Sequence, residues 1–497
     1  MQRPILLLTM IDASHRLETF SALGVPDVQQ QRRRALFAVC FGFFLVLLDT
    51  TALNVATPAL GQEFGDSISD LQWVVNSYTL VFASLLLMAG ALGDRAGVKR
   101  SYQVGLALFT GASLLSAVAP SPVILIMARA AQGFGAAIML PASLAILSHT
   151  FPNAEARSHA VSVWANTASL GFAAGPVLGG LLTAWLGWRT IFWLNVPVGI
   201  AALWFNHLWV KEAKLESARR IDWAAQITLG AGLLAVTYGL IEAGRRGWTN
   251  GASLGAIGFF LLTIPLFVFL ERRSDHPVLP AFLFSKPTFS TCVVVGFVLN
   301  FSMYGILFME SIYLQKARAL GALGAGLLIT PFTLFPTIVS RLLSQKNGAA
   351  YLRSRISLGF ALAGIGSLLL LASTLTSALW PVALALGILG VSMGSIMPAM
   401  TAGVLVSSGP ETAGLASGVL NSARQVGGTV GVALLGTIMG SFPITAGFVY
   451  ATGLTVVVMI ATAHVTSRTL ARPDDPHSAR FPFITGYNGN SPKNCQN

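Results

Sequence analysis

The sequence predicts an all-α polytopic membrane protein, and three observations support that class. Hydrophobic residues make up 54% of the 497 residues and charged residues only 10%, with a mean hydropathy of +0.70. Soluble chains of this length are rarely so apolar. Apolar runs of about 20 residues, the length that crosses the core of a bilayer, recur along the chain. Lysine and arginine cluster in alternate joints between these runs.

Fourteen apolar runs follow one another with short joints, which leave no room for a sizeable soluble domain. We expect membrane spans at about residues 35–58, 71–92, 100–118, 122–148, 158–182, 188–209, 221–242, 252–270, 288–314, 320–343, 355–374, 378–404, 412–439 and 443–464.

The distribution of positive charge predicts the orientation of these spans. Of the 31 Lys and Arg residues, 24 fall on the side that holds both termini and 5 on the other side. This bias is the positive-inside rule, so we expect both termini in the cytoplasm and the chain in the plasma membrane, in a bacterium the inner membrane. The net charge of +12 is thereby explained by topology, and no nucleic-acid partner is expected.

Several kinds of chemistry lack their sequence signals. Cys40 and Cys292 lie in apolar runs and Cys495 in the tail, so no disulfide framework or CxxC metal site is expected. The seven histidines form no HExxH pattern, and no GxxxxGK[ST] stretch is present to bind the phosphates of ATP. We therefore expect no cofactor and no ATP hydrolysis.

The more polar joints divide the spans into six, two and six. Paired six-span halves are how many secondary transporters are built, with the binding site between the halves near the middle of the membrane. The expected units are a cytoplasmic tail (1–34), an N-terminal bundle (35–210), a two-helix insertion (211–287), a C-terminal bundle (288–464) and a second cytoplasmic tail (465–497).

Four charged residues lie clearly inside the predicted spans, one acid and one base in each half: Asp49, Arg129, Glu310 and Arg424. A charge near the centre of a bilayer costs about 2.5–3.5 kcal/mol on insertion scales. Such residues normally face a partner or a watery cavity, so these four are candidates for function.

Depth indicates that Asp49 and Arg129 can meet. Asp49 lies about 14 Å below the outer end of its span at Pro58, and Arg129 lies about 10 Å below Pro122. Making and breaking such a pair changes how readily the acid binds a proton, which is what proton coupling requires. A purely structural ion pair that fixes two helices is the alternative.

Glu310 and Arg424 do not match in depth. Glu310 lies about four residues, roughly 6 Å, from the end of its predicted span, so it could sit in the outer interface. Arg424 lies near the middle of its span and could either line the cavity or bind helix carbonyls.

Two glycine-containing stretches stand out. In GFAAGPVLGG, Gly171, Gly175 and Gly179 recur every four residues and form a smooth strip for close helix packing, while Pro176 can bend the helix. In GALGDRAGVKR, Gly90 and Gly97 would permit a tight cytoplasmic turn. A basic loop that only sets topology would explain the cations there but not Asp94.

These stretches together resemble a known family. LDTTALNVATPAL, GALGDRAGVKR, RAAQGFGAA, GFAAGPVLGG and WRTIFWLNVPVG occur in the order of the motifs of the major facilitator superfamily. The fourteen spans and the later GLASGVLNSARQVGG stretch resemble its fourteen-helix drug/proton antiporter branch of multidrug and antibiotic exporters. The resemblance covers about residues 35 to 465.

The resemblance implies roles for several residues. It implies a proton-coupling role for Arg129, an export-branch acid at Asp49, and an antiporter signature in the strip that ends at Gly180. It implies a conformational latch between the halves, made here by Gly90, Asp94, Arg95, Gly97, Lys99 and Arg100. Val98 departs from the basic residue usual in that loop. The corresponding loop of the second half (340–355) lacks Gly-x-x-x-Asp, so a second latch of this chemistry is not expected.

The sequence thus predicts a proton-coupled exporter of small amphiphilic drugs, antibiotics or toxic metabolites, acting as a monomer by alternating access. An importer of a metabolite with the same fold, or a membrane-embedded enzyme or receptor, are the alternatives. The enzyme or receptor should show a catalytic cluster or a soluble domain, and neither is visible. Candidate substrate-cavity residues, for several of which packing is the alternative, are Asn54, Trp73, Tyr78, Gln132, Asn300, Tyr304, Glu310 and Arg424.

Overall fold

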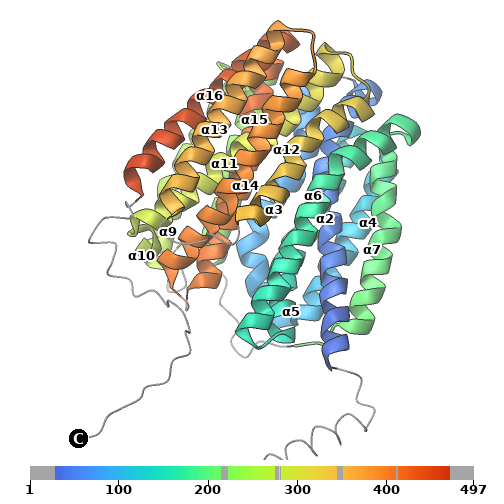
Figure 1. Cartoon of the computed structure of the whole chain (residues 1–497), viewed down its shortest axis with the longest axis vertical. Coiled ribbons are helices and arrows are strands. Elements are labelled where there is room, and N and C mark those ends of the chain that lie inside the picture. Colours follow the sequence, from blue (N-terminus) through green and yellow to red (C-terminus); the bar gives the residue numbers. More distant parts are fainter. Residues whose placement is uncertain are drawn as a thin grey trace, which may run out of the picture.

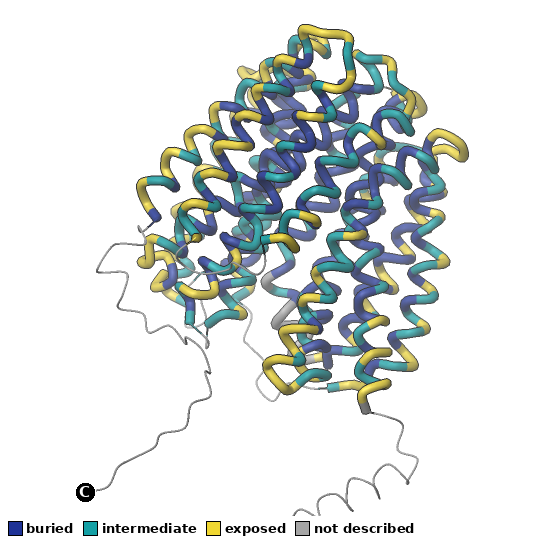
Figure 2. The backbone as a smooth tube through the Cα atoms, in the orientation of Figure 1, coloured by how far each residue is buried: buried dark blue, intermediate teal, exposed yellow. Residues whose placement is uncertain are grey.

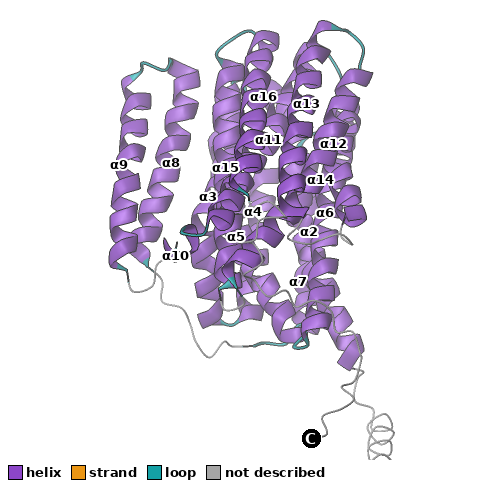
Figure 3. Cartoon of the chain, turned by 60° about the vertical axis from the view of Figure 1, so that its left-hand side comes forward, coloured by secondary structure: helices purple, strands orange, loops and turns teal. Residues whose placement is uncertain are grey.

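The computed structural model contains helices and connecting segments, and the residues it describes include no strand (Figure 3). The described residues are 28–65, 67–213, 222–274, 279, 281–343, 351–409 and 412–470.

Fourteen of the described helices have 20 or more residues. They are α2 (Val28–Phe64), α3 (Ile68–Ala96), α4 (Val98–Ala117), α5 (Pro122–Thr150), α6 (Ala154–Leu186), α7 (Arg189–Trp209), α8 (Trp223–Arg246), α9 (Gly251–Arg273), α11 (Pro287–Ile312), α12 (Ala322–Leu343), α13 (Leu352–Ala372), α14 (Trp380–Ser408), α15 (Ala413–Gly440) and α16 (Ile444–Thr469). Shorter elements are α10 (Ala281–Phe284), the π-helix η1 (Tyr313–Ala317) and the 3₁₀-helix η4 (Ser373–Leu375).

Eleven of these helices are long and apolar enough to cross a membrane. The three long helices outside that set are α3, α4 and α15, which carry more polar and small residues. The prediction of an all-helical polytopic protein is therefore confirmed.

Two helix ends differ from the predicted ones. α2 does not stop at Pro58 but continues to Phe64, because a proline in a long helix removes a single hydrogen bond and the flanking turns can continue. Residues 90–96 are not a loop either. They form the last turns of α3, and the chain reverses at Gly97, whose φ of 97° suits glycine.

Several helices begin where a polar side chain caps the first turn. Ser121 accepts a hydrogen bond from the Ile124 amide before α5, and Asn153 accepts from Glu155 before α6. Asp222 does the same for α8 through the Ala225 amide. Such caps satisfy amides that have no partner inside the helix, so short polar joints suffice between long apolar helices.

The helices pack in two sets, which we call the N-terminal half (α2–α7) and the C-terminal half (α11–α16). Within each half the helices pack mainly on one another, and α6 packs on α12 and α3 on α15 across the two halves. Buried residues gather on the inward faces of the helices (Figure 2). The hairpin of α8 and α9 lies beside both halves (Figure 3), with α8 in contact with α3 and α15.

The two halves approach each other most closely at one end of the molecule. We call the end at which α2 joins α3 the distal end, and the end near Val28 and Thr469 the proximal end. The halves diverge toward the proximal end (Figure 1). At the distal end, Gln72 Nε2 donates to the carbonyls of Val432 and Ala433 at 2.9 and 2.7 Å.

Candidate functional site

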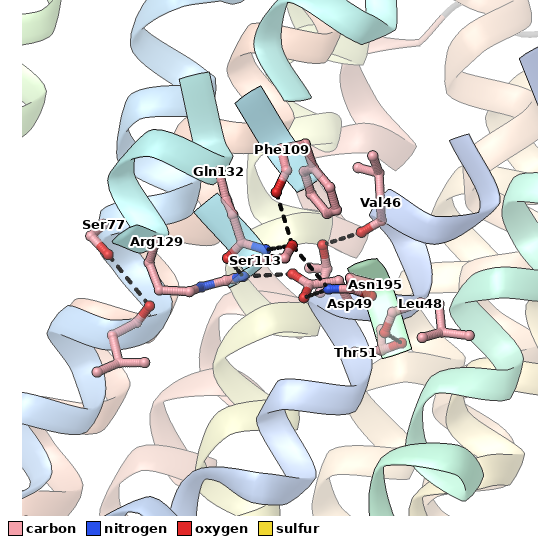
Figure 4. Close-up of polar contacts among 12 residues, drawn as sticks. Val46, Leu48, Asp49, Thr51, Ser77, Phe109, Ser113, Arg129, Gln132 and Asn195 are labelled. Atoms are coloured by element: carbon pink, nitrogen blue, oxygen red, sulfur yellow. Dashed lines mark hydrogen bonds and ion pairs between the residues drawn. The ribbon is translucent and has the colours of Figure 1, made fainter. Parts of the chain in front are cut away.

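Asp49 and Arg129 meet inside the N-terminal half, as their predicted depths indicated. Arg129 Nη1 lies 2.5 Å from Asp49 Oδ2, and the two side chains are 1% and 0% exposed. Asp49 is on α2 and Arg129 on α5, so the ion pair joins two helices (Figure 4). A charge pair so fully removed from water is stable only if its other donors and acceptors are also satisfied.

Three polar side chains extend this pair into a network (Figure 4). Arg129 Nη1 also donates to Gln132 Oε1 at 2.8 Å, and Gln132 Nε2 donates to Ser113 Oγ at 2.6 Å. Asn195 Nδ2 donates to Asp49 Oδ1 at 2.6 Å. We call Asp49, Arg129, Gln132, Ser113 and Asn195 the buried network.

Aromatic rings close the buried network on the guanidinium side. The Tyr78 ring centroid lies 4.5 Å from Arg129 Cζ and the Phe192 centroid 5.8 Å. Cation–π contacts of this kind are favourable when water is excluded. Arg129 Nε and Asn195 Oδ1 are buried without a hydrogen-bond partner among the described residues, so the network still has one donor and one acceptor to offer.

Asn195 and Ser113 were not predicted as site residues. Asn195 lies six residues after the start of α7, about 9 Å along the helix, which matches the depth of Arg129. The depth count that paired Asp49 with Arg129 could therefore have found Asn195. Ser113 gave no such signal, because a small hydroxyl in a membrane span commonly bonds its own helix, as Ser113 does to the Phe109 carbonyl.

The predicted glycine strip packs against the α2 segment that carries Asp49. A Cβ atom on Gly171 would lie 2.6 Å from the Phe44 carbonyl oxygen, and one on Gly179 would lie 2.6 Å from that of Ala52. A Cβ on Gly175 would collide with Thr51 Oγ1. The three glycines thus allow the backbones of α6 and α2 to approach closely.

The remaining two strip residues face the other half. A Cβ on Gly180 would lie 2.7 Å from the Ala322 carbonyl oxygen of α12, and the Pro176 carbonyl lies against Gly326. α6 is therefore in contact both with the acid-bearing helix of its own half and with the C-terminal half.

The predicted latch is described in part. Gly90, Asp94 and Arg95 lie on α3, and their side chains fall outside the described residues. The amides of Lys99 and Arg100 each donate to the Glu212 carboxylate at 3.1 Å.

Glu212 was not predicted as a site residue. A Cβ on Gly97 would lie 2.6 Å from Glu212 Oε1, and the carboxylate sits at the N-terminus of α4, where a negative charge is favourable. No sequence pattern links two positions so far apart along the chain.

The predicted cavity residues do not all gather in one place. Gln132 belongs to the buried network. Arg424 Nε lies 3.5 Å from Asn300 Oδ1 in the C-terminal half, and Tyr304 is buried on α11 of the same half. Tyr78 lies against the Arg129 guanidinium at the edge of the buried network.

Asn54 and Trp73 lie elsewhere. Asn54 is buried on α2, where its amide donates to the Thr50 carbonyl at 2.8 Å and its oxygen has no partner among the described residues. The Trp73 ring lies 6.4 Å from the Tyr238 ring of α8, centroid to centroid, and packs on the buried cluster that includes Leu233 of α8. Its ring is therefore part of the contact between α3 and the hairpin.

Glu310 does not sit in an outer interface. Its side chain is 0% exposed, and neither carboxyl oxygen has a hydrogen-bond partner among the described residues. The helix continues through η1 to Ala317, beyond the predicted end of the span at 314, so Glu310 lies farther from the helix end than the prediction placed it.

An apolar cavity of about 380 Å³ lies between the hairpin and the C-terminal half. Its wall includes Leu233 of α8, Phe267 of α9 and Val430 of α15.

At the proximal end of the hairpin, the amide of Ala225 donates to Asp222 at 3.0 Å. This hydrogen bond is the main reason why the pKa of the Asp222 carboxyl is lowered, and the Ser274 hydroxyl contributes.

Comparison with protein families decides the class of this site. Residues 39–432 match the family model of the Major Facilitator Superfamily. The chain belongs to the major facilitator superfamily. The facilitator resembles methylenomycin A resistance protein of Streptomyces coelicolor, with 35% identity over 81% of this chain and 85% of the relative. This places it in the drug-efflux branch, as its motifs predicted.

Other curated relatives carry similar names. The multidrug resistance protein Stp of Mycobacterium tuberculosis is 34% identical over 82% of this facilitator and 76% of the relative. The tetracenomycin C resistance and export protein of Streptomyces glaucescens is 33% identical over the same shares of the two chains. These names belong to the relatives. Each alignment covers most of the described helices.

Solved structures support the same fold at low identity. A bacterial homologue of the human lysosomal transporter Spinster, in an inward-facing and occupied conformation, superposes with a TM-score of 0.63 and 15% identity over 88% of this chain and 97% of that one. The human organic anion transporter MFSD10 superposes with a TM-score of 0.60 and 17% identity over 88% and 100%. These likenesses show the fold, and the family match shows that the facilitator is a multi-pass membrane transporter.

Proposed function

We propose that this facilitator exports small amphiphilic drugs, antibiotics or toxic metabolites in exchange for protons. The observation that carries the proposal is the buried network, in which an acid and a base meet out of contact with water. The relatives named for antibiotic resistance and export support the direction of transport and the substrate class.

We further propose that all fourteen long helices cross the membrane as six, two and six. The division would fall at residues 35–210, 211–287 and 288–464, with the tails 1–34 and 465–497 in the cytoplasm. The positive-inside count supports this orientation, which makes the proximal end cytoplasmic and the distal end extracellular. The α8–α9 hairpin would then be the two-helix insertion.

The buried network is suited to coupling because it can exist in two charge states. With Asp49 ionised, its oxygens accept from Arg129 and Asn195. A proton on Asp49 would release Arg129, whose guanidinium would then need another partner. Tyr78 borders the network, and Tyr304 and Arg424 belong to the other half. Substrate bound among them would compete with the proton electrostatically.

The strip on α6 offers a mechanical link from this site to the other half. Gly175 and Gly179 rest on Thr51 and Ala52, two and three residues after Asp49, while Gly180 rests on α12. A small shift of α2 on protonation would therefore be transmitted through α6. In this structure the two halves are in contact at the distal end, so we assign it to the inward-facing state of the transport cycle.

The test begins with a growth-inhibition panel of amphiphilic antibiotics in an efflux-deficient bacterial strain, which identifies a transported compound. The purified protein is then placed in liposomes with an imposed pH gradient. We expect Asp49→Asn to fold and to lose gradient-driven uphill transport down to the level of protein-free vesicles.

The matched control is Glu63→Gln on the same helix, which removes an exposed ion pair with Arg189 and should leave transport unchanged. Uphill transport by Asp49→Asn with the wild-type dependence on the gradient would show that Asp49 does not couple protons.

A further inference from the structure

Glu310 is a carboxyl group that the buried network does not use. It lies on α11 two residues before Ile312, fully buried, and both of its oxygens lack a hydrogen-bond partner among the described residues. An ionised carboxylate without partners is strongly unfavourable in an apolar interior, whereas a neutral acid is far less so. The observed burial therefore requires a proton on Glu310.

The helices packed on α11 offer Glu310 no free counter-charge. α14 contains no titratable side chain, and Arg424 of α15 donates to Asn300 and Asn421. On α2, Asp49 and Glu63 are paired with arginines. The other titratable groups of these elements are Arg32, Arg33, Arg34 and Cys40 of α2, Arg341 of α12, Tyr450, His464 and Arg468 of α16, and Tyr313 and Lys316 of η1.

Arg318 follows η1 directly, but its donors are engaged away from Glu310. The guanidinium donates to four backbone carbonyls at 2.7–3.2 Å, those of Ser373, Thr376, Ser377 and Ala378. Arg318 therefore fixes the start of α12 to the end of α13 and leaves Glu310 unpaired.

Glu310 is also next to a contact between the halves. One turn further, in the π-helix η1, Gln315 Nε2 donates to the Val55 carbonyl of α2 at 2.9 Å and to Ser311 Oγ at 3.1 Å. π-Helical segments often occur at functional sites. The carboxyl thus lies beside the point where the distal ends of α2 and α11 are joined.

We propose that Glu310 is a second proton-binding site, filled from the distal side, and that α2 and α11 close there only after it is protonated. One proton moves from external water to a carboxyl oxygen, and no other bond changes. The direction of transport in this inference rests on the proposed function. In this conformation Asp49 would be ionised beside Arg129, whereas Glu310 would be protonated and neutral.

Infrared spectroscopy can detect the proton without any transport assay. In purified protein at pH 7, the carbonyl stretch of a buried protonated carboxyl group should be present, and should shift when the protein is made with ¹³C-labelled glutamate. Glu310→Gln should remove the band, and Asp49→Asn should keep it. Absence of a glutamate band in the wild type would overturn the inference, whether or not the variant folds.

Closure can be followed by the distance between spin labels at Gln62 and Ala317, two exposed distal positions on α2 and η1, with the native cysteines replaced. Raising the pH should favour the open distance in the wild type, by up to about tenfold per pH unit for one linked proton. Glu310→Gln should abolish that dependence and stay closed.

The two readouts separate this inference from the proposed function. Loss of drug export with the band and the pH-dependent distance intact would contradict the proposed function alone. A pH-dependent distance that persists in Glu310→Gln would overturn the gating role of Glu310, even if export were established.

Discussion

Asn195 holds the one oxygen of Asp49 that Arg129 does not, so the carboxylate is bound from α5 and from α7 at the same time. The acid of α2 is therefore a junction of three helices, and each of its contacts can be weakened separately.

Removing one charge of the buried pair should cost more than removing both. Arg129→Gln leaves Asp49 buried without its cation, and we expect a loss of about 3–5 kcal/mol in the free energy of unfolding. The double variant with Asp49→Asn should recover most of it. Thermal unfolding of the four proteins in detergent gives the cycle, and simply additive losses would contradict a coupled pair.

Asn195→Ala should destabilise by about 1.5–3 kcal/mol, because it removes a hydrogen bond to a charged group. The matched control is Asn206→Ala on the same helix. Asn206 is equally buried, but neither of its amide atoms has a partner among the described residues, so its loss should be nearly neutral. Equal costs for the two asparagines in the same unfolding assay would argue against a specific contact to Asp49.

Gly175→Ala should force α6 away from α2, since the added methyl group meets Thr51. Overpacking of this kind costs about 1–3 kcal/mol, and export should fall with it. Gly111→Ala is the control, because a Cβ there meets nothing within 4 Å and should stabilise α4 by about 0.5–1 kcal/mol. Unfolding temperature and efflux are measured together, and an unaffected Gly175→Ala would refute the close packing.

Gln72→Leu should shift the conformational equilibrium and leave the fold intact. Its bonds to the Val432 and Ala433 carbonyls of α15 contribute about 0.5–1.5 kcal/mol each, so the distal ends should separate more often, by roughly tenfold or more. Spin-label distances between α3 and α15 report the shift. Gln62→Leu, at an exposed position on α2, should produce none, and a similar shift in both would point to a non-specific effect.

Asp222 should make the hairpin sensitive to acid. Its pKa is lowered in the folded protein by the Ala225 amide, so its stabilisation is fully present above the ordinary carboxyl value near pH 4 and is lost as the pH falls below it. Asp222→Asn keeps the cap and should remove the pH dependence, while Asp222→Ala should cost about 1 kcal/mol at pH 6 and less at pH 3. The measurement is hydrogen exchange of the first turn of α8 from pH 6 to pH 3 in the wild type and the two variants. Equal exchange rates in all three proteins at each pH would contradict this prediction.

The sequence predicts most of the long helices, because a helix that crosses the apolar core of a bilayer needs about 20 apolar residues. Depth counting predicted the contact of Asp49 with Arg129, since a buried charge must find a partner and few charges are available. Uncharged polar residues in spans are far more numerous, so nothing singled out Ser113. The four-residue spacing predicted a packing face on α6, but spacing alone does not name the helix that covers it.

Other features depend on geometry that no local pattern shows. Glu212 reaches the turn at Gly97 only because α7 ends beside it. Glu310 was placed close to the end of its span because the π-helical continuation of α11 has no sequence signal that the depth count could use. Both residues lie near the end of a helix, which sequence patterns place less accurately than the middle.

The hairpin has a consequence for how this protein could be shortened. α8 covers the seam where Leu80 and Ala83 of one half meet Val426 and Val430 of the other, and α9 touches the rest of the bundle mainly through α8. Deleting residues 222–274 would therefore not yield a minimal twelve-helix pump. It would expose an apolar strip along the contact between the two halves, where lipid tails could insert and keep the halves apart.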